Sequence, residues 1–340
     1  MRRIPIIAAT AALALLLVAL FATPSPAANA APVSAGSHLH IIDLGTLGSP
    51  QDSSQATGIN NRGDVIGWSD IQSCFCSHAF LWRHGKMTDL APLTAANDIN
   101  DDGVIAGAGG TASGYRAFRW AHGKALNLGT LGGDFSQALG INNRGQIVGI
   151  STTATGDWHP FLWYRGKMTD LAPLASAVDI NDQGQIAGSY QLPGSENTDA
   201  FLYRLRDRKL TDLGNLYGWF SQATKLNERG QVVGYVGVAT LSGANSAFFW
   251  SKGHMTDLGT MGGDFSQALG INDRGTVVGA GQVPSVGYRG FVWRNGVMTP
   301  LSVLPAGNSS IAYDINNQGV IVGSSGIDPN NSFYHAVLWR

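Results

Sequence analysis

Short apolar runs separated by Asn/Gly turns recur along most of the chain. In the copy that begins at Ser54, four runs of strand length can be read, at Gln55 to Asn60, Asp64 to Ser69, His78 to Arg83 and Lys86 to Leu90. The Asn and Gly residues between the first two runs and between the last two allow the positive φ that a tight hairpin requires. The pattern therefore predicts four antiparallel strands connected in series.

The third run of each copy is apolar on both sides instead of alternating between apolar and polar residues. Ala79-Phe80-Leu81-Trp82 and Ala247-Phe248-Phe249-Trp250 are examples. A strand of this kind is covered on both faces, as happens when sheets stack face against face around an axis. No window after the leader sustains apolar residues at the spacing of a helix, so we expect an all-β fold.

An Ile-Asn or Leu-Asn pair followed by a turn ending in Gly marks seven copies of this unit. A period of this length is typical of propellers and solenoids, in which one copy cannot bury its apolar surface alone. The anchoring asparagines, 39 to 46 residues apart, are Asn60, Asn100, Asn142, Asn181, Asn227, Asn272 and Asn316.

The two ends of the chain complement each other. The seventh copy stops at Trp339-Arg340 without a fourth strand, and the segment from Ile41 to Gly48 matches the fourth strand of an earlier copy at Met255 to Gly262. Such a split repeat closes a ring and removes its open edges. We predict a seven-bladed β-propeller with four antiparallel strands per blade, the N-terminal strand closing the last blade. A β-solenoid is the alternative.

The recurring segments D-L-G-T-L-G-G, S-Q-A-x-G-I-N-N-x-G-Q-V-V-G and H-A-F-L-W resemble the HAF-type repeat of bacterial extracellular proteins, from Leu44 to Arg340. The resemblance implies a secreted repeat protein and no established activity. Some copies depart from the pattern, because Ala91-Pro92-Leu93 replaces the Gly-Gly-Asp-Phe entry and the His before the third strand is kept only at His78, His159 and His335.

Residues 1–30 predict a signal peptide, with a basic start, an apolar run and a small-x-small site at Ala28-Asn29-Ala30. An uncleaved membrane anchor is the alternative. Residues 31–340 then form a single propeller domain, secreted through the general secretory route, without a further membrane span and monomeric. The formal net charge of −1 and the absence of a basic stripe argue against a nucleic-acid partner.

The only two cysteines, Cys74 and Cys76, are too close in sequence to connect distant parts of the fold. A local C-x-C disulfide and two free thiols remain open. A metal site would need further ligands from neighbouring loops, and the sequence suggests none.

Loops between the second and third strands, and between blades, vary in length and composition, and they share one face of a propeller. Binding residues concentrate on such loops, so this face is the predicted functional face. Its aromatic side chains could stack on sugars or anchor a protein partner. For Phe135 and Phe265, which recur in the same context, the competing interpretation is packing between blades. The predicted ligand-binding residues are Phe75, Tyr115, Trp158, Trp219, Tyr288 and Tyr334.

Two residues before the anchor, some copies carry Gly and others carry Asp98, Asp179, Asp314 or Lys225. The first strand is innermost in a propeller, so three carboxylates there would suit a hard cation such as Ca²⁺. The competing interpretation is that each Asp serves its own turn, and no cofactor is otherwise indicated. The anchoring asparagines and the recurring histidines are interpreted as structural, because Asn at a tight turn bonds its own backbone.

The sequence favours a secreted, non-enzymatic binding or scaffold module whose ligand is an extracellular glycan, a cell-envelope component or a protein. The alternative is a propeller-fold hydrolase or lyase that acts on extracellular polysaccharide. No P-loop, H-E-x-x-H or G-x-S-x-G motif is present. Convergence of Asp98, Asp179 and Asp314 on one pocket, with perturbed pKa values, would favour the enzyme.

Overall fold

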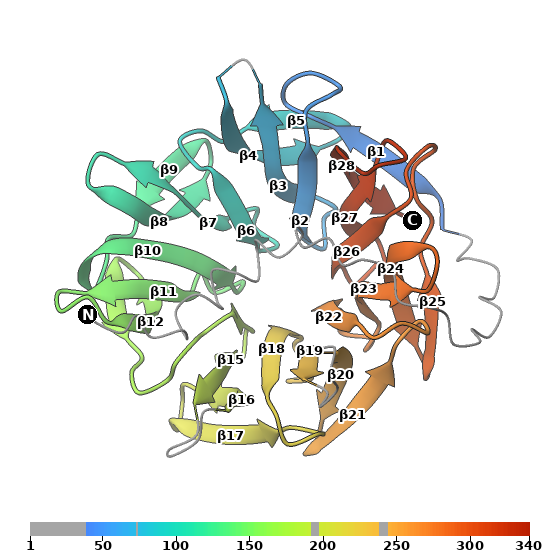
Figure 1. Ribbon diagram of the computed structural model, residues 1–340. Helices are drawn as coiled ribbons and strands as arrows, with labels where there is room; N and C mark the ends of the chain where they lie inside the picture. The colour runs from blue at the N-terminus through green and yellow to red at the C-terminus, as the bar shows by residue number, and fades with distance from the viewer. Residues whose placement is uncertain (1–38, 73, 192–196, 238–243) are drawn as a thin grey trace, which may run out of the picture.

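The fold of the chain consists of β-strands, arranged as small antiparallel sheets around a common centre (Figure 1). This computed structural model describes residues 39–72, 74–191, 197–237 and 244–340. The predicted signal peptide, residues 1–30, lies outside the described residues. Within the described ranges, no helix is long and apolar enough to cross a bilayer.

Each sheet is a meander whose first strand is nearest the centre and whose fourth is outermost (Figure 1). The strands that follow one another in the chain are, for the first half, β2 (Ser54–Ile59), β3 (Val65–Ile71), β4 (Cys76–Arg83) and β5 (Lys86–Asp89); β6 (Ala95–Ile99), β7 (Ile105–Thr111), β8 (Gly114–Ala121) and β9 (Lys124–Asn127); β10 (Gly132–Ile141), β11 (Ile147–Thr153), β12 (Trp158–Tyr164) and β13 (Lys167–Asp170).

The second half of the chain repeats this order. Its strands are β14 (Asp179–Ile180), β15 (Gln185–Gln191), β16 (Thr198–Arg204) and β17 (Lys209–Gly214); β18 (Ser221–Leu226), β19 (Val232–Gly237), β20 (Asn245–Ser251) and β21 (His254–Gly259); β22 (Ser266–Ile271), β23 (Val277–Val283), β24 (Gly287–Arg294) and β25 (Val297–Pro300); β26 (Ser310–Ile315), β27 (Ile321–Gly326) and β28 (Tyr334–Trp339). The four strands predicted in the first copy coincide with β2 to β5 to within two residues at each end.

The first strand, β1 (Ile41–Gly45), pairs with the last one, β28, in antiparallel register. Ile41 lies opposite Trp339, and His40 and Arg340 exchange backbone hydrogen bonds of 2.8 and 3.1 Å. The sheet formed by β26, β27 and β28 therefore takes its outer strand from the other end of the described chain.

Two of the sheets are continuous with each other. Phe135 of β10 pairs in parallel with Tyr115 of β8, and this single contact joins the sheet of β6 to β9 with that of β10 to β13. Phe135 thus lies at a seam between sheets. The residue in the equivalent position, Phe265, makes a parallel bridge to Asn245 of the preceding sheet.

The hydrophobic core fills the spaces between neighbouring sheets. The third strand contributes a fully buried phenylalanine in most sheets, and burial of such a side chain stabilises the fold by roughly 1.5–3 kcal/mol. These residues are Phe80, Phe161, Phe201, Phe248 and Phe291.

The glycine that ends each Val/Ile-rich run has a steric cause. A Cβ at Gly149 would lie 2.0 Å from the carbonyl oxygen of Gln137, on the neighbouring first strand. Real Cβ atoms do not approach backbone so closely, so any larger residue would separate the two strands. The same contact, at 1.9 to 2.4 Å, recurs at Gly67, Gly107, Gly188, Gly234, Gly279 and Gly323.

Candidate functional site

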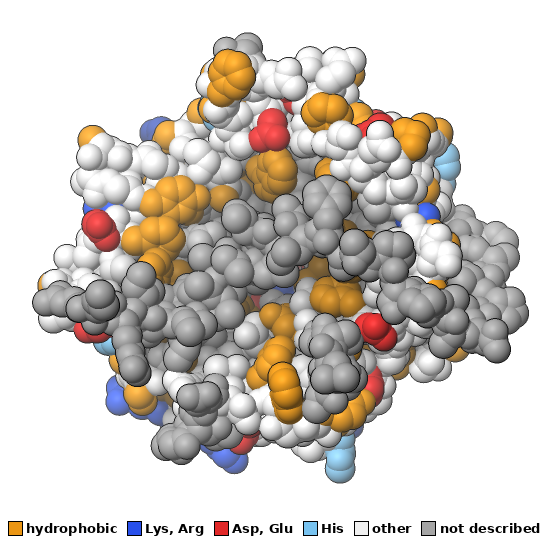
Figure 2. Space-filling view, in the orientation of Figure 1, with side chains coloured by type: hydrophobic (Ala, Val, Ile, Leu, Met, Phe, Trp, Pro, Cys, Tyr) orange, Lys and Arg blue, Asp and Glu red, His pale blue; other side chains and the backbone are white. Residues whose placement is uncertain are grey.

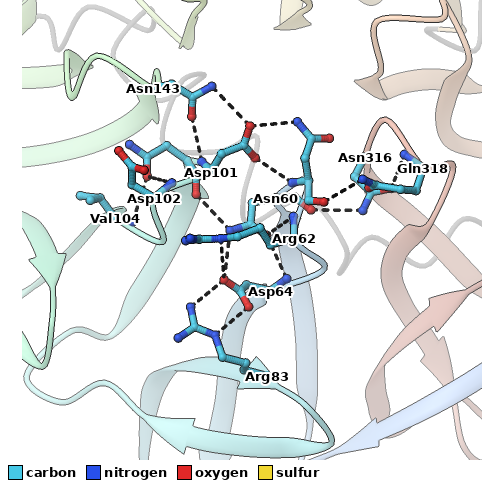
Figure 3. A network of polar contacts seen from close by, with 12 residues as sticks. Asn60, Arg62, Asp64, Arg83, Asp101, Asp102, Val104, Asn143, Asn316 and Gln318 are labelled. Atoms are coloured by element: carbon cyan, nitrogen blue, oxygen red, sulfur yellow. Dashed lines mark hydrogen bonds and ion pairs between the residues drawn. The ribbon is translucent and has the colours of Figure 1, made fainter.

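The anchoring asparagines form a hydrogen-bonded ring around the centre of the molecule. Oδ1 of Asn60 accepts hydrogen bonds from the backbone N–H groups of Arg62 and Asp64, and its Nδ2 donates to the carbonyl of Asn100 at 3.0 Å (Figure 3). The oxygen therefore holds the local turn, as predicted, and the nitrogen joins the next sheet, which the sequence did not indicate. The other donors in the ring, each to the next anchor, are Asn100, Asn142, Asn181, Asn227, Asn272 and Asn316, the last returning to Asn60.

A second ring is formed by the residues that directly follow the anchors. The backbone N–H of Asn61 donates to Oδ1 of Asp101 at 2.8 Å, and the N–H of Asp101 donates to Oδ1 of Asn143 at 2.8 Å (Figure 3). Each turn is thus held by the side chain of the next turn. The remaining members, in order, are Asp182, Glu228, Asp273 and Asn317, whose N–H donates back to Asn61.

The second ring gives the opening near these turns a negative charge. Four of its seven members are carboxylates. Burial raises the pKa of one of them, Glu228. The hydrogen bond from the N–H of Asp182 acts against this rise, and the charges of Asp182 and Asp273 add to it. A polar residue follows every anchor in the sequence, so the signal for this ring was present. We call this opening, lined by the two rings, the turn mouth.

Behind the turn mouth, the three predicted aspartates lie on the innermost strands β6, β14 and β26 and are almost fully buried. Each uses one oxygen to accept a backbone N–H from a neighbouring sheet: Asp98 from Ile141 at 2.8 Å, Asp179 from Leu226 at 3.0 Å and Asp314 from Ile59 at 3.0 Å. Asp179 and Asp314 also accept the N–H of the following residue, at 2.9 Å. The hydrogen bond to the local turn that the sequence suggested is therefore only part of what these aspartates do.

Lys225, on β18, lies among these carboxylates. Its Nζ is 3.0 Å from Oδ1 of Asp98 and 3.8 Å from Oδ1 of Asp179. Burial lowers the pKa of Lys225, but the charges of Asp179, Asp98 and Asp314 outweigh burial and raise the pKa above its ordinary value. The lysine is therefore cationic at neutral pH.

Two of the aspartates, Asp179 and Asp314, do not titrate as ordinary surface carboxyls. Burial raises the pKa of Asp179 to about 7, the Lys225 ammonium acts in the opposite direction, and the Asp98 carboxylate adds to the rise. Burial also raises the pKa of Asp314, again against the effect of Lys225. A carboxyl group with a pKa near 7 can donate and accept a proton at neutral pH.

The asparagine ring, the second ring apart from Asp182, the three aspartates and Lys225 line one cavity of about 140 Å³. Its members come from first strands around the whole centre, from β2 to β26. A water molecule occupies about 30 Å³ in the liquid, so the space holds a few waters or one small polar group. The cavity is therefore at the short, uniform turns and not on the face of variable loops that the sequence favoured.

The Ca²⁺ hypothesis for Asp98, Asp179 and Asp314 does not fit this arrangement. The ammonium group of Lys225 lies 3.0 Å from Asp98 and 3.8 Å from Asp179, and backbone N–H groups occupy one oxygen of Asp98 and both oxygens of Asp179 and Asp314. Ca²⁺ requires six to eight oxygen ligands. In the described ranges no group of three His, Cys, Asp or Glu side chains has the arrangement of a metal site.

The predicted ligand-binding aromatics do not form one surface. Figure 2 shows hydrophobic side chains in separate groups on one face of the molecule, one of them over β8 and β10. Tyr115 stacks on Phe135 at a centroid distance of 5.4 Å, and Phe135 contacts Trp158 at 4.8 Å. Tyr288 instead packs edge-on against Phe265, at 5.6 Å.

The other three aromatics are apart from that cluster. Phe75 is 97% exposed and Trp219 is 50% exposed, whereas Tyr334 is partly buried and burial raises its pKa. Of the six predicted residues, the structure brings together only Tyr115 and Trp158, with Phe135 between them.

The recurring histidines make the structural hydrogen bonds predicted for them. Nδ1 of each ring pairs with an aspartate of the adjacent outer strand at 2.7 to 2.8 Å. The pairs are His78 with Asp89, His159 with Asp170, and His335 with Asp43.

No protein-family model and no curated protein matches the chain. Solved structures do match. The β-propeller domain of the Trilobed protease from Pyrococcus furiosus is 14% identical with a TM-score of 0.55, over 74% of this chain and 81% of that chain. A puromycin-hydrolyzing peptidase from Mycobacterium tuberculosis is 12% identical with a TM-score of 0.53, over 84% of this chain and 52% of that one.

An acylaminoacyl peptidase is 10% identical with a TM-score of 0.51, over 81% of this chain and 50% of that one. The chain thus spans about half the length of these two peptidases. At such low identities the likeness establishes the fold, a β-propeller.

The prediction of a non-enzymatic binding or scaffold module is wrong in the light of these findings. Three of the solved structures that share the fold are a protease domain and two peptidases. Of the three aspartates on which the enzyme alternative depended, Asp98, Asp179 and Asp314, all converge on one cavity, and burial raises the pKa of two, Asp179 and Asp314.

Proposed function

We propose that the chain is a propeller-fold hydrolase that acts on an extracellular polysaccharide, with its acid–base chemistry in the cavity behind the turn mouth. The observation that carries the proposal is the convergence of three buried aspartates and one lysine on that cavity. Structural ion pairs alone would not require an accessible space beside them, whereas a catalytic acid must reach its substrate.

The two carboxyl groups nearest Lys225 have the properties that hydrolysis of a glycosidic bond requires. Asp179, with a pKa of about 7, is the proton donor to the leaving oxygen. Asp98, ion-paired with Lys225 at 3.0 Å, supplies the carboxylate that activates water or stabilises the positive charge of the transition state. Glycosidases use two carboxyl groups in this way, one as the acid and one as the base or nucleophile.

The size of the cavity limits the substrate. Because about 140 Å³ holds only a small polar group, we propose action at the end of a polysaccharide chain, with the rest of the polymer outside the turn mouth. The carboxylates of the second ring favour a neutral or cationic sugar over an anionic one. The cluster of Tyr115, Phe135 and Trp158 would bind sugar rings by stacking at a separate surface.

Several further properties belong to the same proposal. We propose that the sheets are seven blades of one closed ring, with β1 completing the last blade. The pairing of β1 with β28 and the return of the asparagine ring from Asn316 to Asn60 support this. We also propose that the mature chain is a secreted monomer of the HAF-type repeat family.

The test is hydrolysis by the purified mature protein. A panel of neutral, cationic and anionic bacterial polysaccharides is incubated with the protein, and new reducing ends are measured. Asp179→Asn and Asp98→Asn should each lower the rate at least about 100-fold, whereas Asp264→Asn, an exposed residue outside the cavity, should leave it unchanged. The rate should fall as the pH rises through about 7, because Asp179 must carry a proton.

The absence of turnover on the whole panel, from protein that unfolds cooperatively, would contradict the proposal. Full activity of folded Asp179→Asn would contradict the assignment of the acid. Products with an unsaturated end would identify a lyase instead of a hydrolase.

A further inference from the structure

A second chemical arrangement lies at the opposite edge of the sheet from the turn mouth, between β3 and β4. Cys74 and Cys76 form a disulfide between residues two positions apart, and both Cys74 and the intervening Phe75 are exposed. Sγ of Cys76 is 3.5 Å from Nε2 of His78. Cys74 of the disulfide is therefore accessible to solvent, and the sulfur of Cys76 contacts an imidazole.

The imidazole of His78 is oriented by Asp89 on β5. Nδ1 of His78 is 2.8 Å from Oδ2 of Asp89, and Oδ1 of the same carboxylate accepts the backbone N–H of Ala91 at 2.8 Å. Nδ1–H of His78 donates its hydrogen bond to the Asp89 carboxylate. The other ring nitrogen, Nε2, is therefore the one that faces the sulfur of Cys76. Sulfur, imidazole and carboxylate thus stand in the order found where a cysteine is activated by a histidine and a third orienting group.

Comparison with another copy of the repeat shows which part of this arrangement is structural and which part is an addition. His159 and Asp170 form the same pair at 2.7 Å in another sheet, without a cysteine nearby. The position two residues before that histidine is Asp157. The His–Asp pair is therefore a feature of the repeat, and the disulfide is an addition to one copy of it.

We propose that the Cys74–Cys76 disulfide is a thiol–disulfide exchange site that oxidises dithiols of peptide chains. A substrate thiolate attacks Sγ of Cys74, the Cys74–Cys76 bond breaks, and its electron pair passes to Sγ of Cys76. Nε2 of His78, which is unprotonated while Nδ1–H donates to Asp89, takes the proton that the substrate thiol releases on becoming a thiolate and then donates it to the Cys76 thiolate. A stabilised leaving thiolate speeds such an exchange.

The second substrate thiolate then attacks the substrate sulfur of the mixed disulfide and releases Cys74 as a thiolate. The substrate loses two electrons and two protons and gains a disulfide, and the protein gains a dithiol. A low-molecular-weight disulfide restores the oxidised protein by the reverse exchange. Phe75, 97% exposed between the two cysteines, offers an apolar contact to a peptide substrate.

His78 is the catalytic residue of this step, because its ring contacts the leaving sulfur, and Asp89 is a positioning residue that acts through the ring. His78→Ala should slow the exchange at least about tenfold. Asp89→Ala should slow it comparably, and Asp89→Asn, whose amide oxygen still accepts from Nδ1–H, should restore most of the rate. His159→Ala, which removes the equivalent ring elsewhere, should leave the rate unchanged.

The experiment uses the full mature protein and a fluorescent peptide that carries two cysteines, with glutathione disulfide as the oxidant. The rate of peptide oxidation is measured for the wild type and the variants above, and thermal unfolding verifies that they are folded. Cys74→Ser should abolish the reaction. Equal rates for His78→Ala and His159→Ala would overturn the proposal, as would a wild-type rate no greater than that of a free peptide spanning residues 71–78.

Discussion

The side-chain amide of Asn316 donates a hydrogen bond of 3.1 Å to the backbone carbonyl of Asn60, 256 residues earlier in the chain. The oxygen of the same side chain accepts the N–H groups of Gln318 and Val320 in its own turn. One residue thus fixes a local turn and a contact between sheets that are distant in sequence. These two functions can be separated by mutation.

Asn142 is suited to this separation. Asn142→Ala removes two hydrogen bonds accepted in the turn and two that the amide donates, one to the carbonyl of Asn181 and one to Oε1 of Gln146, and it should lower the free energy of unfolding by about 2–4 kcal/mol. Asn142→Asp retains the acceptor of the turn and loses the donor. Urea unfolding at pH 7 should place it between the wild type and the alanine variant. Wild-type stability of Asn142→Asp would show that the contact between sheets contributes nothing.

Two glycines on β7 give a matched test of the close contact between first and second strands. A Cβ at Gly107 would lie 2.2 Å from the carbonyl oxygen of Ala95, whereas a Cβ at Gly110 would meet no atom within 4 Å. Gly107→Ala should therefore destabilise the protein by about 1–3 kcal/mol or more. Gly110→Ala should be neutral or slightly stabilising. Equal melting temperatures of the two variants would contradict this explanation of the repeated glycine.

Asp179 should make stability depend on pH in a direction opposite to that of an ion-paired surface carboxyl. Its folded pKa of about 7 lies above the ordinary 3.8, so the folded state binds more protons than the unfolded state between these values. The free energy of unfolding should thus fall as pH rises from about 4 to about 7, by at most about 1.4 kcal/mol per pH unit. Asp179→Asn should reduce this slope in urea unfolding, and an unchanged slope would contradict the shift.

The pair of His335 and Asp43 should stabilise the junction of β28 and β1 over a defined range of pH. The hydrogen bond to Asp43 raises the pKa of His335 above 6.5, so its contribution is present below 6.5 and is lost as pH rises through the folded value. Burial raises the pKa of Asp43, but the hydrogen bond to His335, the hydrogen bond from the N–H of Gly45 and the charge of His335 together outweigh burial. The net pKa is below 3.8, so the contribution of Asp43 is lost only at lower pH.

His335→Ala should therefore lower the melting temperature most between about pH 4 and pH 6.5, and less at pH 8. The matched control is His159→Ala, because His159 and Asp170 join strands that a tight turn already connects. We expect a smaller loss for the control. Equal losses for both variants at all pH values would show that the pair has no special role in holding β1.

Those features of the fold that depend on local chemistry were accessible from the sequence. The strands, the turns anchored by asparagines such as Asn60, and the match of Ile41 to the end of the chain follow from periodicity and repeated turn residues. The convergence of Asp98, Asp179 and Asp314 followed from their shared position on innermost strands. That inference needed only the order of strands in a blade.

What the sequence did not reveal depends on distances between copies. Lys225 replaces an aspartate or glycine in its repeat, and only the radius of the channel brings its ammonium within 3.0 Å of Asp98. Composition also does not determine the direction in which a loop projects. The sequence could therefore not show that Trp219 and Phe75 lie apart from Tyr115. The contact of His78 with Cys76 arises because β4 begins at Cys76, two residues before the start predicted from the sequence, so that both side chains lie on one face of that strand.

The exchange of backbone hydrogen bonds between His40 and Arg340 has a consequence for engineering. Two residues in this relationship can be bridged by a short hairpin loop. In a circularly permuted gene, codon 340 would be followed by such a loop and then by codon 39. The gene could begin at the exposed turn 154–156 between β11 and β12. The permuted chain would retain the strand pairing of the described residues, and its new ends would lie between the second and third strands of one sheet instead of between a third strand, β28, and a fourth strand, β1.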